Sequence, residues 1–254
     1  MPPQHDIDID AFHEAPVTLE RREGPYGEVV LRRRSGGGGR GRDRDRGRNG
    51  ARGGVYEIIA NGCFLMDTSD GRSERLLVRA ALDALPAGRV RPALLIGGLG
   101  VGFSLAEAAA EPRWGRITVV ERERAVIDWH RRSPLDSVSG AALADPRGEV
   151  VHTDLVAYLR TGAAARRYDA LCLDIDNGPD WTVADEHENL YGPTRLAACR
   201  ECLTPGGVLA LWSSRPSAAF EDALRNAGFR DVRTEEIQVV RGVPDVVHLA
   251  IRGA

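Results

Sequence analysis

The sequence contains no lysine, so all 34 of its basic residues are arginine. A lysine Schiff base and a phosphate-binding loop that depends on lysine are therefore excluded. The sequence also has no apolar run of the roughly 18 to 20 residues that a membrane-spanning helix needs. Its polar, acidic N-terminal stretch lacks the basic and apolar regions of a secretory signal. We therefore expect a cytoplasmic location and no membrane partner.

Cysteine and histidine are scarce, and their spacing does not favour a metal site. The four cysteines include one C-x-x-C pair, Cys199 and Cys202, without a second Cys or His pair that would complete a zinc site. The stretch "LAACRECL" around this pair is typical of the buried face of a helix, and the six histidines are scattered. We expect no metal cofactor.

The charge balance does not favour nucleic acid as a partner. The net charge is −3, which gives no basic field over the whole surface. One segment, residues 35–54, is built almost wholly of Gly, Arg and Asp and cannot form a buried core. It is either a surface loop that joins two strands or a tract that binds RNA through its arginines.

The 254 residues are enough for one large core or for one core with a small satellite domain. The runs "YGEVVLRRR" and "VYEIIANGCFLMD" flank the Gly/Arg segment and resemble the arms of a β-hairpin. We predict a flexible N-terminus at 1–17, a small β unit at 18–70 and a catalytic domain at 71–254.

The rest of the chain alternates helices with short apolar strands. The stretch "SERLLVRAALDALP" predicts an amphipathic helix that ends at Pro86. Its predicted apolar side consists of Leu76, Leu77, Ala80, Ala81 and Leu85. The strands that follow are "PALLIGG", "RITVVE", "GEVVHTD", "YDALCLDID" and "GGVLALWSS", and residues 229–253 supply a closing hairpin. This pattern predicts an α/β fold with a doubly wound, mostly parallel seven-stranded sheet.

A glycine-rich turn follows the first of these strands. The stretch "ALLIGGLGVGFSLAEAA", residues 93–109, places Gly97, Gly98, Gly100 and Gly102 between the strand and a helix. In parallel α/β sheets the backbone approaches a ligand most closely at this turn. Phe103 stands where the last glycine of a dinucleotide fingerprint would be, which argues against a dinucleotide. The alternative is a glycine-rich turn without a ligand.

Three acidic residues end the next three strands in order. Glu121 is placed to accept hydrogen bonds from both hydroxyls of a ribose, and Asp154 from the amine of adenine. Asp174 ends the central strand, where we expect it to lie next to the reacting groups. Each one alone is also compatible with a helix N-cap or a solvated strand end. Together they favour a nucleoside site.

Five stretches together resemble the class I S-adenosylmethionine-dependent transferase fold. These are "LLIGGLGVGFSL", "ITVVERERAVIDWHR", "VVHTDLVAYL", "YDALCLDIDNGP" and "LTPGGVLALWSS". Within that fold they resemble the spermidine and spermine synthases, the polyamine aminopropyltransferases. The resemblance extends from about Arg91 to Ser214 and, weakly, into the N-terminal β unit.

The resemblance implies a donor, which is decarboxylated S-adenosylmethionine or S-adenosylmethionine itself, and a homodimer. Gly98, Gly100 and Gly102 would then pass under the methionine-derived chain of the donor, with Gly97 beside them. Glu121 would hold the ribose, and Asp154 would hold the adenine.

The resemblance also implies catalytic residues after the fourth strand, where the family has a D-S-S-D-like motif. Asp174 would deprotonate the attacking amine, and Asp176 and Asn177 would orient it. Trp181 and Tyr191 would cover the acceptor, although Trp181 is also compatible with a packing role.

The family's Tyr-His-Glu cluster falls near "SERLLVRAAL", which offers Glu74 and Arg75 but neither Tyr nor His. An arginine that faces a polycation is unfavourable, which weakens the case for a polyamine acceptor.

Three functions are therefore compatible with the sequence. The first is a spermidine synthase-like transferase that moves an aminopropyl group to a small amine. The second is an S-adenosylmethionine-dependent methyltransferase with a small non-polyamine acceptor. The third is a non-catalytic protein that binds a nucleoside thioether or RNA.

Overall fold

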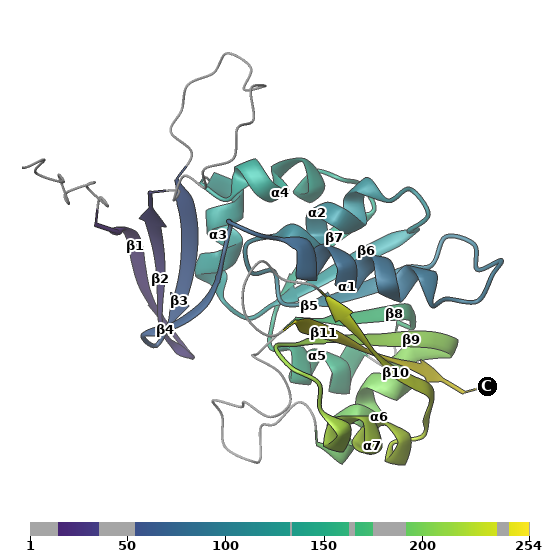
Figure 1. Ribbon diagram of the computed structural model, residues 1–254. Coiled ribbons are helices and arrows are strands. Elements are labelled where there is room, and N and C mark those ends of the chain that lie inside the picture. Colours follow the sequence, from purple (N-terminus) through teal and green to yellow (C-terminus); the bar gives the residue numbers. More distant parts are fainter. Residues whose placement is uncertain are drawn as a thin grey trace, which may run out of the picture.

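The computed structural model describes residues 15–35, 54–132, 134–162, 166–174, 192–237 and 244–253. The described residues form a small sheet and a large sheet with helices on both faces of the large one (Figure 1). Most of the predicted Gly/Arg segment, residues 36–53, lies outside these ranges, so its two interpretations stay predictions.

The small sheet is antiparallel throughout, with its strands in sequence order. Its strands are β1 (Val17–Gly24), β2 (Gly27–Arg34), β3 (Val55–Ala60) and β4 (Cys63–Asp67). The predicted hairpin is confirmed, because β2 pairs antiparallel with β3 and Leu31 lies opposite Ile58, both buried. Asn61 and Gly62 have positive φ values of 50° and 77°, as a tight two-residue turn requires, and they divide the second arm into β3 and β4.

The large sheet has the order β10-β11-β9-β8-β5-β6-β7. Its strands are β5 (Ala93–Gly97), β6 (Arg116–Glu121), β7 (Gly148–His152), β8 (Tyr168–Leu173), β9 (Leu203–Ser213), β10 (Phe229–Ile237) and β11 (Asp245–Arg252). The five strands from β9 to β7 are parallel, and β11 and β10 close the sheet as an antiparallel hairpin. The predicted doubly wound, seven-stranded α/β fold is confirmed.

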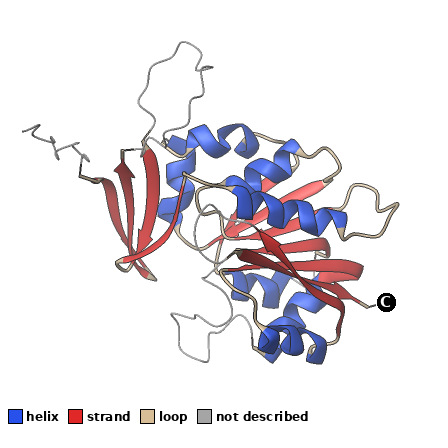
Figure 2. Ribbon diagram, in the orientation of Figure 1, coloured by secondary structure: helices blue, strands red, loops and turns tan. Residues whose placement is uncertain are grey.

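Two layers of helices cover the large sheet (Figure 2). The helices are α1 (Arg72–Asp83), α2 (Phe103–Ala110), α3 (Arg124–Arg132), α4 (Asp136–Leu143), α5 (Leu155–Gly162), α6 (Pro193–Cys202) and α7 (Ala218–Asn226). Strand β5 shows why both faces are covered: Leu94 and Ile96 pack in the core with α1 to α4, whereas Leu95 packs with α5 to α7. Full burial of each such side chain contributes about 1.5–3 kcal/mol.

Helix α1 is present as predicted, but its buried face differs from the predicted one. Leu77, Val78, Ala81 and Leu82 are buried, whereas Leu76 is exposed. The helix contacts β8, β9 and β11 as well as α2, so the side of the helix that faces the sheet centres on Leu77 and Ala81. The expectation that Leu76 belongs to the apolar side is therefore wrong.

The C-x-x-C pair lies on α6, where Cys199 and Cys202 are both buried in the core, as predicted. Within the described ranges, no group of three or more His, Cys, Asp or Glu side chains is arranged to hold a metal ion. No helix in these ranges has the length and apolar character needed to cross a bilayer.

The small sheet is fastened to the large domain by polar contacts from β1 to α3. Arg22 donates to the Asp128 carboxylate at 2.9 Å, and the indole of Trp129 donates to Glu20 at 2.8 Å. Because three of these four side chains are ionised, the bonds are stronger than neutral ones. The docking brings β4 to the edge of the large sheet where β5 ends.

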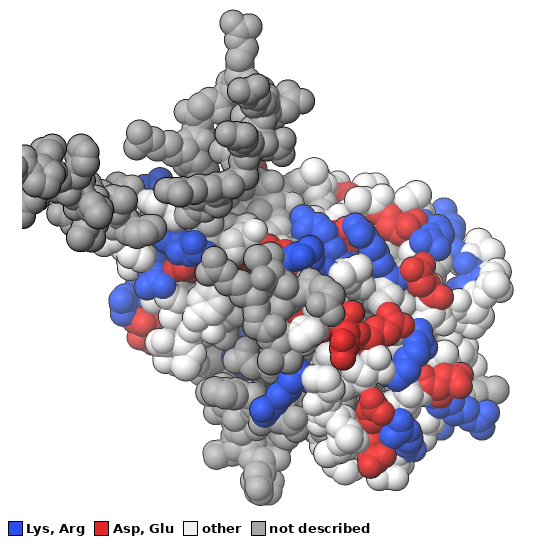
Figure 3. Space-filling model, in the orientation of Figure 1, with Lys and Arg blue, Asp and Glu red and all other residues white. Residues whose placement is uncertain are grey.

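Arginine and acidic side chains are intermixed on the face shown in Figure 3. Ion pairs such as Arg79 with Glu107 and Arg225 with Glu221 also bring charges of opposite sign together. Such a face produces no single-sign field that would attract nucleic acid.

Candidate active site

The turn between β5 and α2 lies at the carboxyl edge of the parallel strands, where such sheets bind ligands. Gly98, Gly100 and Gly102 all have positive φ, at 91°, 49° and 97°. Glycine adopts this left-handed conformation at little cost, whereas a residue with a Cβ does not. The backbone N–H of Gly98 donates to the carbonyl of Val120 at 2.9 Å, which fixes the turn on β6.

The glycines of the turn serve different purposes. Gly98 and Gly100 are partly exposed and border a small pocket that Asp174 also lines. A Cβ on Gly102 would lie within 3 Å of Ser139 and His130, so this glycine is also required for packing. Gly97 is buried at the end of β5 and is not among the residues that line the pocket.

Met66 covers the turn from the small sheet. Its sulfur accepts a hydrogen bond from the backbone N–H of Val101 at 3.0 Å, and a Cβ on Gly100 would collide with it. Sequence reasoning missed this residue, because a single methionine on a short strand gives no periodic signal. The thioether is flexible and polarisable, which suits a residue that must adjust to a bound ligand.

Glu121 lies where it was predicted, at the end of β6 against the glycine turn. It is buried, and its two oxygens accept hydrogen bonds from the backbone N–H groups of Leu99 at 2.8 Å and Glu123 at 2.7 Å. A carboxylate has about four lone-pair sites, so it retains capacity for a ribose. Binding of the ribose stays a prediction.

Asp154 caps a helix. Its Oδ1 accepts from the backbone N–H of Ala157 at 2.9 Å, at the start of α5, as the N-cap alternative predicted. The second carboxylate oxygen is not used in this contact. The proposed role with adenine depends on that oxygen and stays a prediction.

Two acidic residues, from separate elements, line the pocket. Asp174 follows β8, and Glu74 lies in the first turn of α1. Burial raises the pKa of Asp174 to about 6, with a smaller contribution from Asp245. Burial also raises the pKa of Glu74 to about 8, and the charge of Asp174 adds to that increase. Raised pKa values of this kind are frequent at functional sites.

The start of α1 holds Glu74 in place through close contacts with α2. Gly71 precedes the helix, and a Cβ there would collide with Phe103. The hydroxyl of Ser104 donates to the backbone carbonyl of Glu74 at 3.4 Å. These contacts place the first turn of α1 directly over the glycine turn.

Arg75 does not line the pocket, although it follows Glu74 in the chain. Its guanidinium lies 4.4 Å from the centroid of the Phe103 ring and donates to the carbonyl of Gly71 at 3.2 Å. Its other contact is with Glu107 on α2, at 3.8 Å. Arg75 therefore lies against Phe103, which lines the pocket, and is not itself a lining residue.

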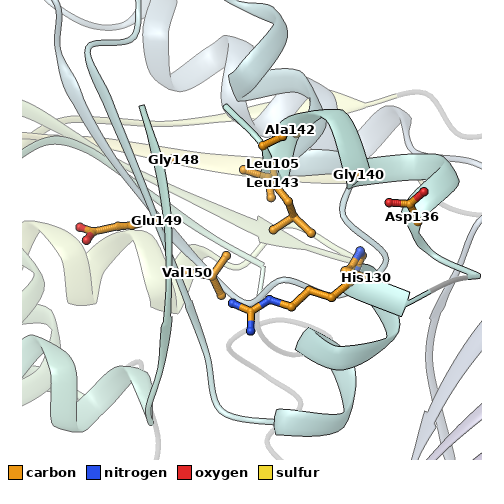
Figure 4. Close-up of a pocket in the computed structure, with 11 residues that line it drawn as sticks. Leu105, His130, Asp136, Gly140, Ala142, Leu143, Gly148, Glu149 and Val150 are labelled. Carbon is orange, nitrogen blue, oxygen red and sulfur yellow. The ribbon is translucent and has the colours of Figure 1, made fainter. Parts of the chain in front are cut away.

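A larger cavity of about 430 Å³ lies elsewhere, between α4 and the first residues of β7 (Figure 4). Leu143 and Val150 line it, and Glu149 points away from its centre. Because β7 begins here, the cavity is at the amino end of the strand, away from the edge where parallel sheets bind ligands. The smaller pocket at the glycine turn is therefore the candidate active site.

His130 lies between this cavity and the glycine turn. Its Nε2 is 2.8 Å from the carbonyl oxygen of Gly100, and its Nδ1 is 2.5 Å from the hydroxyl of Ser139. A carbonyl can only accept, so Nε2 carries the hydrogen and Nδ1 accepts from Ser139. Burial lowers the pKa of His130 and keeps the ring neutral. A lone histidine on an apolar helix face is the only signal that the sequence offers for this contact.

The remaining predicted site residues, Asp176, Asn177, Trp181 and Tyr191, lie outside the described residues. Their predicted roles with the acceptor stay predictions.

The family model of the spermine/spermidine synthase domain matches residues 74–226, which include the glycine turn and the strand-end acids. The chain belongs to this family. Among its relatives, a polyamine aminopropyltransferase of Nitrosomonas europaea is 32% identical over 159 residues, which are 61% of this chain and 45% of the relative. The putrescine N-methyltransferase 4 of Nicotiana tabacum is 33% identical over 134 residues, which are 53% of this chain and 32% of that protein.

The solved structures agree with this family at the level of the fold. The crystal structure of a spermidine synthase in complex with the transition state analogue AdoDATO matches with a TM-score of 0.69 and 18% identity. The match covers 93% of this chain and 74% of that one. The chain spans about half the length of the aminopropyltransferases of Nitrosomonas europaea and Pseudomonas aeruginosa.

Proposed function

We propose that the protein transfers an aminopropyl group from decarboxylated S-adenosylmethionine to a small amine. The observation that carries this proposal is the charge of the pocket at the glycine turn. Glu74 and Asp174 line it, and none of its described lining residues is basic. Both donors carry a sulfonium and an ammonium group, but only S-adenosylmethionine also carries a carboxylate, which would bring a third acid to this pair.

The donor-binding roles follow from the positions of the strand ends. The methionine-derived chain of the donor passes over Gly98 and Gly100, since neither carries a side chain into the pocket. Glu121 holds the ribose with its unused lone pairs, and the free oxygen of Asp154 accepts from adenine. Alignment of the acceptor with the reacting carbon contributes up to about 7–11 kcal/mol to catalysis in the best cases.

Asp174 is the general base of the proposed reaction. An alkylamine has a pKa near 10 and must lose a proton before it can attack the carbon next to the sulfonium. With a pKa of about 6, Asp174 is mostly ionised at pH 7 and is a stronger base than an ordinary aspartate. The nitrogen–carbon bond forms as the carbon–sulfur bond breaks, and methylthioadenosine leaves.

The names of the relatives support the proposal. Polyamine aminopropyltransferases of several bacteria match this chain at 30–32% identity. They also support an amine as the acceptor, because these enzymes are named for polyamines.

Methyl transfer from S-adenosylmethionine is the second candidate function. The putrescine N-methyltransferases among the relatives favour it, since two of them match at 32–33% identity. This reaction needs the pocket to accommodate the donor carboxylate beside Glu74 and Asp174. The same base and the same class of acceptor would serve both reactions.

A thermal-shift titration with three ligands separates the two functions. The ligands are decarboxylated S-adenosylmethionine, S-adenosylmethionine and methylthioadenosine, and each stabilises the fold by RT ln(1 + [L]/Kd), about 2.7 kcal/mol at 100 times Kd. We expect the decarboxylated donor to raise Tm at concentrations at least roughly tenfold lower than the carboxylated donor, about 1.4 kcal/mol of binding free energy. The opposite order would favour methyl transfer, and no shift with any ligand would contradict a nucleoside site.

A further inference from the structure

Among the residues that the structure describes, the lining of the pocket at the glycine turn contains two acids and no basic residue. Glu74 and Asp174 are its two charged lining residues among those the structure describes, although the chain has 34 arginines. Two carboxyl groups in one partly buried pocket cannot both ionise cheaply without a cation between them. The unliganded pocket therefore retains a proton at neutral pH.

Burial and the charges of neighbouring acids favour the protonated form of Glu74. Glu74 has the higher pKa, about 8 against about 6, because the surrounding acids add to the effect of its burial. The charged groups that raise it come from three other elements: Asp174 after β8, Asp70 in the turn before α1, and Asp245 at the start of β11. Arg75 is directed toward Phe103 and Glu107 instead.

We propose that Glu74 recognises the cationic end of the sulfonium donor and that the donor displaces a proton from Glu74 when it binds. The O–H bond of the Glu74 carboxyl group breaks, the proton passes to the solvent, and the carboxylate pairs with the ammonium group of the donor. Asp174 stays ionised and available as the base. This inference rests on the proposed function, and it adds a specificity-determining residue on α1.

Proton release makes donor affinity depend on pH. At pH 7 a group with a pKa of about 8 is about nine-tenths protonated, so binding that ionises it releases about nine-tenths of a proton. Since ligand binding and proton release are linked, affinity for the decarboxylated donor rises about tenfold from pH 6 to pH 7. The rise ends above pH 8, where Glu74 is already ionised in the free protein.

Isothermal titration calorimetry at pH 7.0, in buffers with different ionisation enthalpies, counts the released protons. Decarboxylated S-adenosylmethionine is the test ligand. Methylthioadenosine, which has the nucleoside but no positive charge, is the comparison. We expect about nine-tenths of a proton with the donor and close to none with methylthioadenosine.

Two variants assign the proton. Glu74→Gln keeps the size of the side chain and removes the titration, so proton release should fall close to none. Glu107→Gln makes the same change on the neighbouring helix, outside the pocket, and should behave as the wild type. A melting curve shows that each variant is folded, and Glu74→Gln should not lower Tm at pH 7, because Glu74 is mostly uncharged in the free protein.

The outcomes separate this inference from the proposed function. If the donor binds but the wild type releases no proton, or if Glu74→Gln releases as much as the wild type, the inference is wrong and the function stands. Equal release with methylthioadenosine also overturns it, since no cation is then involved. If the decarboxylated donor does not bind to the wild type at all, both the inference and the proposed function are wrong.

Discussion

Replacement of Asp174 by Asn is expected to lower turnover by about 10²- to 10⁴-fold, while donor affinity changes little. The amide keeps the shape of the side chain but cannot accept the proton of the attacking amine. The loss should shrink as the pH rises, because more of the acceptor then arrives without its proton. In the wild type at saturating donor, kcat/KM for the amine should fall below pH about 6, where Asp174 itself becomes protonated.

Asp169→Asn is the matched control for this prediction. Asp169 lies on the same strand but near its amino end, where it accepts from Ala93 and Thr204 and pairs with Arg89. This variant should lose stability and retain its rate per folded molecule. If Asp174→Asn lost donor affinity in proportion to its turnover, Asp174 would be a binding residue. An unchanged rate would rule it out as the base.

Gly100→Val is expected to abolish donor binding in a protein that still folds. A side chain at this position meets the sulfur of Met66 and, with φ at +49°, occupies the pocket surface where the donor chain must pass. Met66 can move aside because its side chain is flexible, so we expect most of the cost to appear in binding. Donor affinity, measured by calorimetry, should fall by at least about 100-fold, or 2.7 kcal/mol.

Gly62→Val is the control for backbone strain. Gly62 also has a positive φ, +77°, but a Cβ there meets no atom within 4 Å, and Gly62 is not among the residues that line the pocket. The Gly62→Val variant should therefore have a lower Tm and an unchanged donor affinity. Donor binding that survives in a folded Gly100→Val protein would show that the turn does not hold the donor.

The sheet was predictable because each central strand is a short block of apolar residues between turn signals. Leu94, Leu95 and Ile96 are all buried, as a parallel strand covered on both faces requires. The same blocks fixed the positions of Glu121 and Asp174, since a polar residue directly after such a block must lie at the carboxyl edge. Those two positions follow from local pattern alone.

The contacts that complete the site could not be predicted in this way. The hydrogen bond from Val101 to Met66 joins residues 35 positions apart and depends on how the small sheet docks. The contact between His130 and Gly100 depends on the packing of α3 beside the turn. The raised pKa of Glu74 depends on acids from three separate elements, which a sequence pattern does not place together.

The orientation of α1 was predicted incorrectly for a related reason. Its leucines at 76 and 77 are adjacent, so periodicity alone allows either to face the core. The contacts of α1 with β8, β9 and β11 decide in favour of Leu77 and leave Leu76 exposed. The same orientation directs Glu74 into the pocket.

The most direct test of aminopropyl transfer is identification of the products. The wild-type protein would be incubated with putrescine and either decarboxylated S-adenosylmethionine or S-adenosylmethionine, and the products separated by mass spectrometry. With the decarboxylated donor, the proposed function predicts methylthioadenosine and an aminopropylated amine in equal amounts. At the same incubation time and enzyme concentration, the Asp174→Asn variant should form neither product. Formation of S-adenosylhomocysteine and a methylated amine from S-adenosylmethionine, with no product from the decarboxylated donor, would contradict it.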